Sequence, residues 1–538
     1  MKEIFYNANV YSGSLPLREA FVVEDGRFLF VGDNESALAL AQEGDSLHDL
    51  EGKFVCPGFN DSHMHLLGFG GLLSIAQLGK ATGSLEEMLG CLRDFLQENP
   101  VEEGGWLKGR GWNQDYFSDV QRMPTRWDLD RVSTEVPIYA TRACGHCLVV
   151  NSKALELLGV TADTPQPEGG SIGMEDGVPN GQFFDNAMDP VYAAVPAPSK
   201  EAVKDMIRRS CKALNAYGIT SCQTDDYSSF RSVPWQQINE AYRELEASGE
   251  LSVRVYEQAN FTSVPELEDY IAAGNQSGTG SLLFKAGPLK MLGDGALGAR
   301  TAYLSQPYAD DPSTCGLPVF SQQLMDDMVL CAHKNGLQIA VHAIGDACLD
   351  SVLSAYEKAL AAYPREDHRH GIVHCQITRP DQLQKIAELG LHVYAQSIFL
   401  DYDIRIVEPR VGKELADSSY SWKTLMELGV SVSNGSDCPV ELPDCLASMQ
   451  CAVTRRNLQG DLGPYLPQQA FSVQEALDSY SSRAAEASFE EAVKGRIQSG
   501  MLADFVILGG NPFTCPAERI KDIPVLSTRL GGREVFHP

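Results

Sequence analysis

Residues 323–342, QLMDDMVLCAHKNGLQIAVH, contain the two patterns on which the predicted fold depends. The segment Gln323–Asn335 predicts a helix, and the short apolar run Gln338–His342 predicts a strand. Further helices are predicted at Lys200–Tyr217 and Arg379–Leu389. Apolar strands that alternate with helices are typical of parallel βα units, so the sequence predicts an α/β protein.

Strand-like apolar runs occur eight times along the chain, which predicts a closed (β/α)₈ TIM barrel over residues 56–484. The eight runs are Phe54–Phe59, Ile219–Gln223, Val253–Gln258, Leu283–Leu292, Gln338–His342, Gly371–His374, His392–Gln396 and Val430–Val432. The gap between the first two runs is too long for one crossover connection. It contains its own strand-like run, Val136–Thr141, and a loop rich in proline and glycine, Thr164–Gly181. We therefore expect an insertion at about residues 66–215, near the mouth of the barrel.

The two ends of the chain also contain short strand-like runs. Near the N-terminus these are Glu3–Tyr6, Ala20–Val23 and Phe28–Val31, with Asp25-Gly26 as a hairpin turn. Near the C-terminus the run is Ala503–Leu508. Residues 1–55 and 485–538 are therefore predicted to form one small β-sheet domain, although the sequence alone does not prove that the two segments pair.

The overall composition limits the classes of partner. The 538 residues include 43 basic and 72 acidic side chains, which gives a net charge of −29. Such a surface repels phosphate backbones and anionic lipids, so neither nucleic acid nor a membrane surface is expected as a partner. A homodimer is compatible with the sequence, which does not determine the oligomeric state.

Several features indicate a cytoplasmic protein. The first residues lack the apolar core and cleavage site of a signal peptide. No apolar stretch approaches the roughly 18 residues that a membrane helix needs. The 14 cysteines show no repeated spacing, which is typical of reduced thiols in a cytosol.

Histidines and an aspartate occur where predicted strands end. In the segment DSHMH at residues 61–65, His63 and His65 are two positions apart and would point to the same side of an extended chain. His342 and His374 each close a strand, and Asp437 follows the last strand. Barrel enzymes keep their catalytic groups at this rim, and imidazole is the commonest metal ligand. Packing alone does not readily account for four histidines and an aspartate at matching strand ends.

Lys290 lies within the fourth predicted strand. An inward-facing lysine is costly unless it is paired or modified. Reaction with CO₂ would convert it into a carbamate that bridges two cations. The alternative is an ion pair with Asp437 or Asp294, and Lys285 would point to the opposite face of a regular strand.

The sequence resembles the amidohydrolase superfamily, and more narrowly its N-substituted formamide deformylase-like branch, amidohydrolase family 3. The resemblance covers nearly the whole chain. It rests on PGFNDSHMH at 57–65, GH at 145–146 before NSKAL at 151–155, Lys290 before DGALG at 294–298, HAIGD at 342–346, HCQ at 374–376, GSDCP at 435–439 and GMLAD at 500–504. Together these motifs are specific for the family and poorly specific for the substrate.

The resemblance implies a metal centre with one or two Zn²⁺ ions, other divalent transition metals being alternatives. His63, His65 and Asp437 would hold one ion, His342 and His374 a second, with Lys290 between them. Val373 departs from the family pattern, because an acidic residue is expected before the histidine. A cation of this kind lowers the pKa of bound water to about 7. Asp437 would accept the proton and pass it to the leaving amine.

The expected activity is hydrolysis of an amide or N-substituted formamide, with Asp437 and His342 as candidate catalytic residues. The expected partner is a small-molecule, amide-type substrate. Two other functions remain open: a deaminase that acts on a heterocycle, and a non-catalytic barrel that serves as a scaffold. A scaffold would be expected to lose metal ligands, whereas this chain retains every one.

Three further residues are candidates for substrate binding. The resemblance places a histidine at His146, and Arg300 follows a loop rich in glycine. Trp112 would either cover the pocket as a lid or pack in a core. A solvent-facing loop histidine is the alternative for His146, and an ordinary surface arginine is the alternative for Arg300.

Two local motifs point to other functions. Cys144-Gly145-His146-Cys147 matches a thioredoxin-type redox motif and is predicted to lie between a strand and a helix, but no thioredoxin-sized βαβ unit surrounds it. The glycines at 293, 295 and 298 match a dinucleotide-binding fingerprint, but no acidic residue follows at the distance needed to bind a ribose. Neither motif therefore predicts the main function.

Overall fold

The computed structural model describes all 538 residues. The chain forms two compact units, Met1–Gly68 together with Ile207–Pro538, and Phe69–Met206. None of the helices is long and apolar enough to span a lipid bilayer.

The larger unit contains an eight-stranded parallel sheet, and the predicted TIM barrel is confirmed. In sheet order its strands are β7 (Phe59–Met64), β14 (Ile219–Thr224), β15 (Arg254–Asn260), β16 (Phe284–Leu292), β17 (Ile339–Ala343), β18 (Gly371–His374), β19 (His392–Ala395) and β20 (Val432–Asn434). The two outer strands are joined just beyond their ends, where the amide of Asp437 donates to the carbonyl of His63 at 2.9 Å. The amide of His65 likewise donates to the carbonyl of Cys438 at 2.7 Å.

The residue range predicted for the first barrel strand, Phe54–Phe59, is wrong. Residues Phe54–Pro57 form β6, which belongs to a different sheet, and the barrel strand β7 begins at Phe59. The partner changes at Gly58, whose amide donates to Asp504, whereas the amide of Phe59 donates to Gly218 in front of β14. A Cβ atom at Gly58 would lie 2.2 Å from the Thr220 hydroxyl oxygen, so the close approach requires glycine here. The predicted apolar run ends at Phe59, before most of β7, because residues 60–63 are polar although they are buried.

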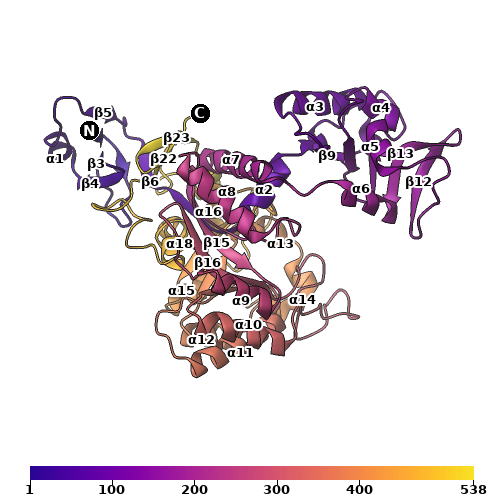
Figure 1. Cartoon of the computed structure of the whole chain (residues 1–538). Helices are drawn as coiled ribbons and strands as arrows, with labels where there is room; N and C mark the ends of the chain where they lie inside the picture. The colour runs from indigo at the N-terminus through magenta and orange to yellow at the C-terminus, as the bar shows by residue number, and fades with distance from the viewer. The chain divides into compact units, whose positions relative to one another are not determined.

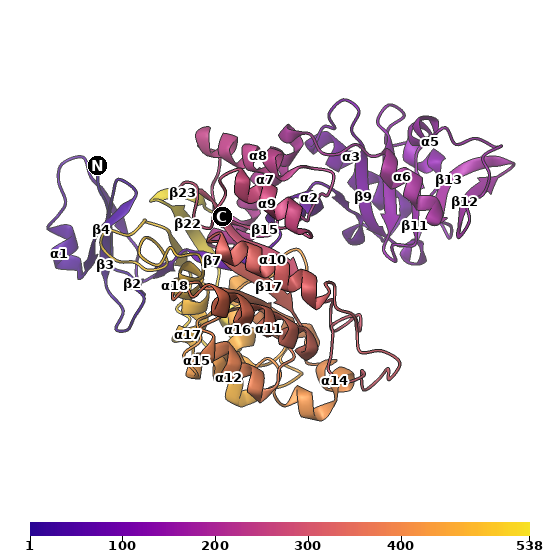
Figure 2. The ribbon, with the colours of Figure 1, turned by 60° about the horizontal axis from the view of Figure 1, so that its bottom comes forward.

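Helices cover the outside of the barrel. The predicted helices at 200–217, 323–335 and 379–389 correspond to α7 (Lys200–Ala216), α10 (Gln322–Lys334) and α12 (Pro380–Glu388). Figure 2 shows α10 beside α11 (Asp346–Ala362), with both helices next to β17. The βα alternation predicted from residues 323–342 is therefore present.

The ends of the chain form two sheets instead of one. The first sheet has the order β4 (Arg27–Gly32), β3 (Ala20–Glu24), β1 (Glu3–Tyr6) and β5 (Ser46–Asp49). The second has the order β2 (Asn9–Val10), β6, β21 (Phe505–Leu508), β22 (Val525–Leu530) and β23 (Arg533–Phe536), so strands from both termini lie in one sheet (Figure 1). The two sheets share an apolar core that includes Phe5, Phe21, Phe28, Val55 and Phe505.

The smaller unit, residues 69–206, has its own sheet and its own core. The sheet order is β12 (Gly170–Glu175), β13 (Val178–Asp185), β11 (Cys147–Val150), β10 (Ile138–Arg142), β9 (Leu107–Trp112) and β8 (Ala76–Gln77). Strand β10 corresponds to the predicted run Val136–Thr141. The predicted loop Thr164–Gly181 instead contains β12 and the beginning of β13, because its glycines occupy a hairpin.

Candidate metal centre

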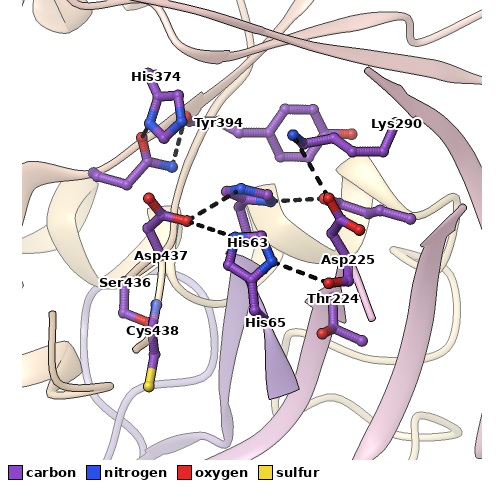
Figure 3. Close-up of polar contacts among 12 residues, drawn as sticks. His63, His65, Thr224, Asp225, Lys290, His374, Tyr394, Ser436, Asp437 and Cys438 are labelled. Atoms are coloured by element: carbon purple, nitrogen blue, oxygen red, sulfur yellow. Dashed lines mark hydrogen bonds and ion pairs between the residues drawn. The ribbon is translucent and has the colours of Figure 1, made fainter. Parts of the chain in front are cut away.

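Three potential metal ligands meet at one end of the barrel. His63 lies in β7, His65 follows directly after it, and Asp437 follows β20. The Nε2 atoms of His63 and His65 lie 3.3 and 3.2 Å from Oδ1 of Asp437 (Figure 3). This is the one group of three or more histidine, cysteine or carboxylate ligand atoms that lie within 4.8 Å of one another. The neighbouring positions of β7 and β20 in the closed barrel bring these residues together.

The other nitrogen of each imidazole is held by a neighbouring strand. Nδ1 of His63 lies 2.7 Å from Oε1 of Gln258 in β15. Nδ1 of His65 lies 3.0 Å from the carbonyl oxygen of Asp225, just after β14. Because these oxygens accept a hydrogen bond from Nδ1–H, both Nε2 lone pairs are directed to the Asp437 side.

A buried carboxylate fixes the turn that carries Asp437. Asp61 accepts hydrogen bonds from the amide and the hydroxyl of Ser436 and from the amide of His63. Gly435 is required in this turn, because a Cβ atom there would lie 2.5 Å from the amide nitrogen of His63. Burial raises the pKa of Asp61 to about 7, although the hydrogen bonds from Ser436 and His63 oppose this shift.

Lys290 is fully buried in β16, and its Nζ has no hydrogen-bond partner. The nearest carboxylate is that of Asp225, whose Oδ2 lies 3.9 Å from Nζ (Figure 3). Burial lowers the pKa of Lys290, against the opposing charges of Asp225 and Asp437. The alternative to carbamylation, an ion pair of Lys290 with Asp437 or Asp294, is not formed, because the carboxylate that Lys290 faces is that of Asp225. Lys285 lies outside this group and pairs with Glu490 at 2.7 Å.

His374 and His342 lie next to the three ligands without joining them. The ring of His374 is centred 5.8 Å from that of His63 and 4.4 Å from that of His342. Nδ1 of His374 lies 2.7 Å from Oε1 of Gln396. Nε2 of His342 instead lies 3.0 Å from the carbonyl oxygen of Gly295 and 3.2 Å from a carboxylate oxygen of Asp294.

Asp437 and His65 shift each other's pKa in opposite directions. Burial alone would raise the pKa of Asp437, but the imidazoles of His63 and His65 outweigh it and lower that pKa well below its ordinary value. Burial would lower the pKa of His65, but Asp437 outweighs it and raises the pKa to about 9. Burial lowers the pKa of His63 and of His374. The carboxylate is therefore ionised, and a cation that binds His65 must first displace a proton.

Of the three predicted substrate-binding residues, Trp112 and His146 belong to the smaller unit, and Arg300 belongs to the larger one. Trp112 is fully buried in the core of the smaller unit, where its indole N–H donates to the carbonyl of Ala140 at 2.8 Å. It packs in a core, so the prediction of a lid is not supported. His146 is exposed, and its Nδ1 lies 3.1 Å from Asp185. Arg300 is held by Asp310 at 2.9 Å.

The structure also changes the context of the two local motifs. Cys144-Gly145-His146-Cys147 joins two antiparallel strands, β10 and β11, so the expected strand-to-helix setting is wrong. Two glycines of the dinucleotide-type motif are needed for local packing: a Cβ atom at Gly293 would lie 2.5 Å from the carbonyl oxygen of His342, and one at Gly295 would lie 2.2 Å from the Thr301 hydroxyl oxygen.

Sequence reasoning missed the groups that orient the ligands. These are Gln258, Gln396, Asp225 and Asp61. Gln258 and Gln396 are the last residues of two predicted strands, and Asp225 follows another by two positions. The signal that could have revealed them is a polar side chain that ends an apolar strand at the catalytic rim.

Comparisons with known proteins agree with this geometry. The amidohydrolase family model matches residues 47–536. The chain is 31% identical over 545 residues to YtcJ of Bacillus subtilis, whose name describes it provisionally as an amidohydrolase; the match covers 100% of this chain and 99% of that protein. It is 26% identical to the N-substituted formamide deformylase of Arthrobacter pascens, over 96% of this chain and 94% of that protein.

A solved structure has the same architecture. The crystal structure of a metal-dependent hydrolase from Pyrococcus furiosus superposes with a TM-score of 0.76 at 28% identity, over 96% of this chain and 100% of that chain. Both the family match and the relatives extend over nearly the entire sequence. The chain therefore belongs to the amidohydrolase family and is a hydrolytic enzyme that acts on carbon–nitrogen bonds.

Proposed function

We propose that the enzyme hydrolyses an amide or an N-substituted formamide at a divalent-cation centre built on His63, His65 and Asp437. One observation carries the proposal: two imidazole nitrogens and a carboxylate oxygen converge at one end of the barrel, where β7 and β20 meet. A mixed nitrogen and oxygen donor set suits zinc and related transition metals.

The residues present fit such a cation. Oδ1 of Asp437 is buried and accepts no hydrogen bond of good geometry, although it faces both imidazoles. A buried, unsatisfied carboxylate oxygen costs free energy, and a cation held by the two imidazoles would satisfy it. His63 and His65 are also oriented from behind, as is typical of metal-binding histidines.

Lys290, His374 and His342 would complete the centre in its two-ion form. The buried amine of Lys290 makes no hydrogen bond and lies 3.9 Å from Asp225, and its lowered pKa favours the neutral amine that attacks CO₂. In that reaction the N–C bond of a carbamate forms and the nitrogen loses a proton. His374 is oriented by Gln396, whereas Nε2 of His342 is occupied by Gly295 and Asp294. His342 would therefore have to turn its ring, or use Nδ1, to serve as a ligand or catalytic residue.

The catalytic step depends on a proton that Asp437 first accepts and then donates. A divalent cation bound here supplies Lewis acidity, which lowers the pKa of a coordinated water to about 7. The depressed pKa of Asp437 keeps its carboxylate ionised, so neither oxygen carries a proton before the reaction. We place that proton on Oδ2, the oxygen that does not face the imidazoles, and its transfer to the leaving nitrogen completes cleavage of the C–N bond. Arg300 and His146 are engaged with carboxylates, and we assign them no step.

The proposed substrate class is supported by the similarity to an N-substituted formamide deformylase, at 26% identity. The enzyme would release a carboxylic acid and an amine. A deaminase would instead release ammonia from a heterocycle by attack of a similar water. The two activities are separated by screening formamides and amides against aminated heterocycles and measuring acid, amine and ammonia. We further propose a cytoplasmic enzyme with no nucleic-acid partner, consistent with the net charge of −29.

Metal analysis tests the centre directly. Purified enzyme should contain at least one transition-metal ion per chain, and a chelator should abolish hydrolysis until the metal is restored. His63→Ala should lose both metal and activity. His48→Ala, at a half-buried histidine in β5, is the matched control and should keep both. Full activity in enzyme shown to be free of metal would exclude the proposed centre.

A further inference from the structure

The turn between β10 and β11 brings two cysteines together. The carbonyl of Arg142 accepts a hydrogen bond from the amide of Gly145 at 3.0 Å, and Gly145 has a φ of +76°, which favours glycine. The chain thus reverses between Arg142 and Cys147, which places the two thiols near each other, and each thiol shifts the pKa of the other. A disulfide needs this kind of close approach between the two side chains.

The two thiols have different surroundings. Cys144 is the one exposed cysteine of the 14 in the chain, whereas Cys147 is 4% exposed. The amide of His146 and the guanidinium of Arg142 lower the pKa of the Cys144 thiol. Burial and the neighbouring Cys144 raise the pKa of Cys147 to about 12. An accessible thiol beside a protected one is the usual arrangement of an attacking and a resolving cysteine.

A metal site and a packing role both fit the cysteine pair less well. A metal site would need a third ligand, but no carboxylate or imidazole joins the two thiols within 4.8 Å. A purely structural role in the apolar core would suit Cys147, which packs among buried side chains, but it does not account for Cys144, which is exposed. Both cysteines belong to the smaller unit, whereas the proposed metal ligands belong to the larger one.

We propose that Cys144 and Cys147 form a thiol–disulfide exchange site that reacts with low-molecular-weight disulfides. The Cys144 thiolate attacks one sulfur of the small disulfide, which forms a mixed disulfide and releases one thiolate. Cys147 then gives up its proton and attacks the Cys144 sulfur, which releases the second small thiol. The two cysteines are oxidised to one disulfide, and the small disulfide is reduced to two thiols.

The full-length enzyme can be tested with oxidised glutathione as the small disulfide. Free thiols are then trapped with N-ethylmaleimide, and peptides that contain residues 144–147 are identified by mass spectrometry. We expect the wild type to form the Cys144–Cys147 disulfide and to release two equivalents of glutathione. Cys147→Ser should accumulate a mixed disulfide at Cys144. Cys144→Ser should react at about one tenth of the wild-type rate or less, because it lacks the thiol that attacks.

Controls separate this outcome from general thiol oxidation. Cys315→Ser and Cys515→Ser change half-buried cysteines outside the hairpin and should leave both reactions unchanged. Circular dichroism shows whether each variant is folded, and Cys147→Ala replaces Cys147→Ser if the serine disturbs the core. The proposal is overturned if folded Cys147→Ser and Cys147→Ala collect no glutathione at Cys144. It is equally overturned if the wild type retains the mixed disulfide without forming the internal bond.

Discussion

At the scale of single residues, Asp437 has two proposed roles that one change of atom can separate. The side chain is a proposed metal ligand through Oδ1 and a proposed proton acceptor through Oδ2. Asp437→Asn keeps the shape and one oxygen but cannot accept the proton. We expect kcat to fall by about 10²–10⁴, the usual contribution of general acid–base catalysis. Metal content should fall much less than in His63→Ala, because His63 and His65 remain.

Measuring kcat and metal content on the same Asp437→Asn preparation distinguishes the two roles. Loss of metal together with activity would show only that Asp437 is a ligand. Retained metal with nearly unchanged kcat would place the base elsewhere. The same logic does not apply to His65, because one ring nitrogen faces Asp437 and the other donates to the carbonyl of Asp225, so no second atom is left for proton transfer.

Lys290 and Lys285 provide a matched pair of lysines on one strand. Both lie in β16, but Lys290 lies beside the proposed centre and makes no hydrogen bond, whereas Lys285 pairs with Glu490. Lys290→Ala should abolish most activity, and a short carboxylic acid should restore part of it by replacing the proposed carbamate. Lys285→Ala should retain the metal and respond to no added acid. Wild-type activity in Lys290→Ala would limit this residue to a structural role.

At the scale of secondary structure, the motif GMLAD at 500–504, near the C-terminus, binds the terminal sheet to the barrel. Arg254 in β15 makes two hydrogen bonds to Asp504, at 2.6 and 2.9 Å, and both side chains are buried. Asp504 also accepts a hydrogen bond from the amide of Gly531, just after β22, at 2.7 Å. The motif therefore has a structural role that does not involve the catalytic centre.

This buried ion pair predicts a large asymmetry between single and double substitutions. Asp504→Ala should destabilise the enzyme by about 3–5 kcal/mol, because it leaves the Arg254 charge buried without a partner. The double variant Arg254→Met/Asp504→Leu should be closer to the wild type, since no charge remains buried. Thermal unfolding midpoints of the three proteins measure this. Asp417→Ala, which removes an exposed pair with Lys413, should shift the midpoint little. A double variant as unstable as Asp504→Ala would contradict this account of the ion pair.

The elements also show how far the sequence can predict the fold and the site. The βα alternation and the histidines at the ends of β17 and β18 are apparent because their strands are continuous apolar runs. Strand β7 is not, because Asn60, Asp61 and Ser62 are polar residues buried by contacts from other strands. Gln258 and Gln396 orient proposed metal ligands on neighbouring strands, and such pairing depends on register, which a single sequence does not contain.

At the scale of the whole molecule, burial shifts the pKa values of carboxyl and imidazole groups, and the two kinds of group change the pH dependence of stability in opposite directions. Burial raises the pKa of Asp61 to about 7 and that of Asp403 to about 6, so their contributions favour the folded state as the pH falls. Buried histidines such as His370 and His392 have lowered pKa values and act in the opposite sense. The stability curve of the whole chain is the sum, and only differences between variants isolate one group.

His370 is a suitable group for such a difference. Its Nδ1 accepts the amide hydrogen of Ile339 at 3.1 Å, and its Nε2 lies 2.8 Å from Nδ1 of His333, whose own Nε2 lies 2.6 Å from the carbonyl oxygen of Tyr363. This chain of hydrogen bonds is complete with both imidazoles neutral, and a further proton on His370 would have no acceptor. Burial, with the neighbouring His368, Arg365 and His333, lowers the pKa of His370 well below 6.5.

Acid should therefore destabilise the enzyme through His370 in a predictable window. As the pH falls below 6.5, the unfolded chain takes up a proton at this position while the folded chain does not, so stability is lost. One such proton changes the unfolding free energy by about 1.4 kcal/mol per pH unit. His370→Gln should be less stable throughout, but its free energy of unfolding should fall less steeply between pH 6.5 and 5, by about that amount. Leu337→Ala, at a fully buried neighbour without a titratable group, should lower stability and keep the wild-type slope. Denaturant unfolding at several pH values measures both slopes, and equal slopes in the wild type and His370→Gln would show that His370 is protonated in the folded enzyme.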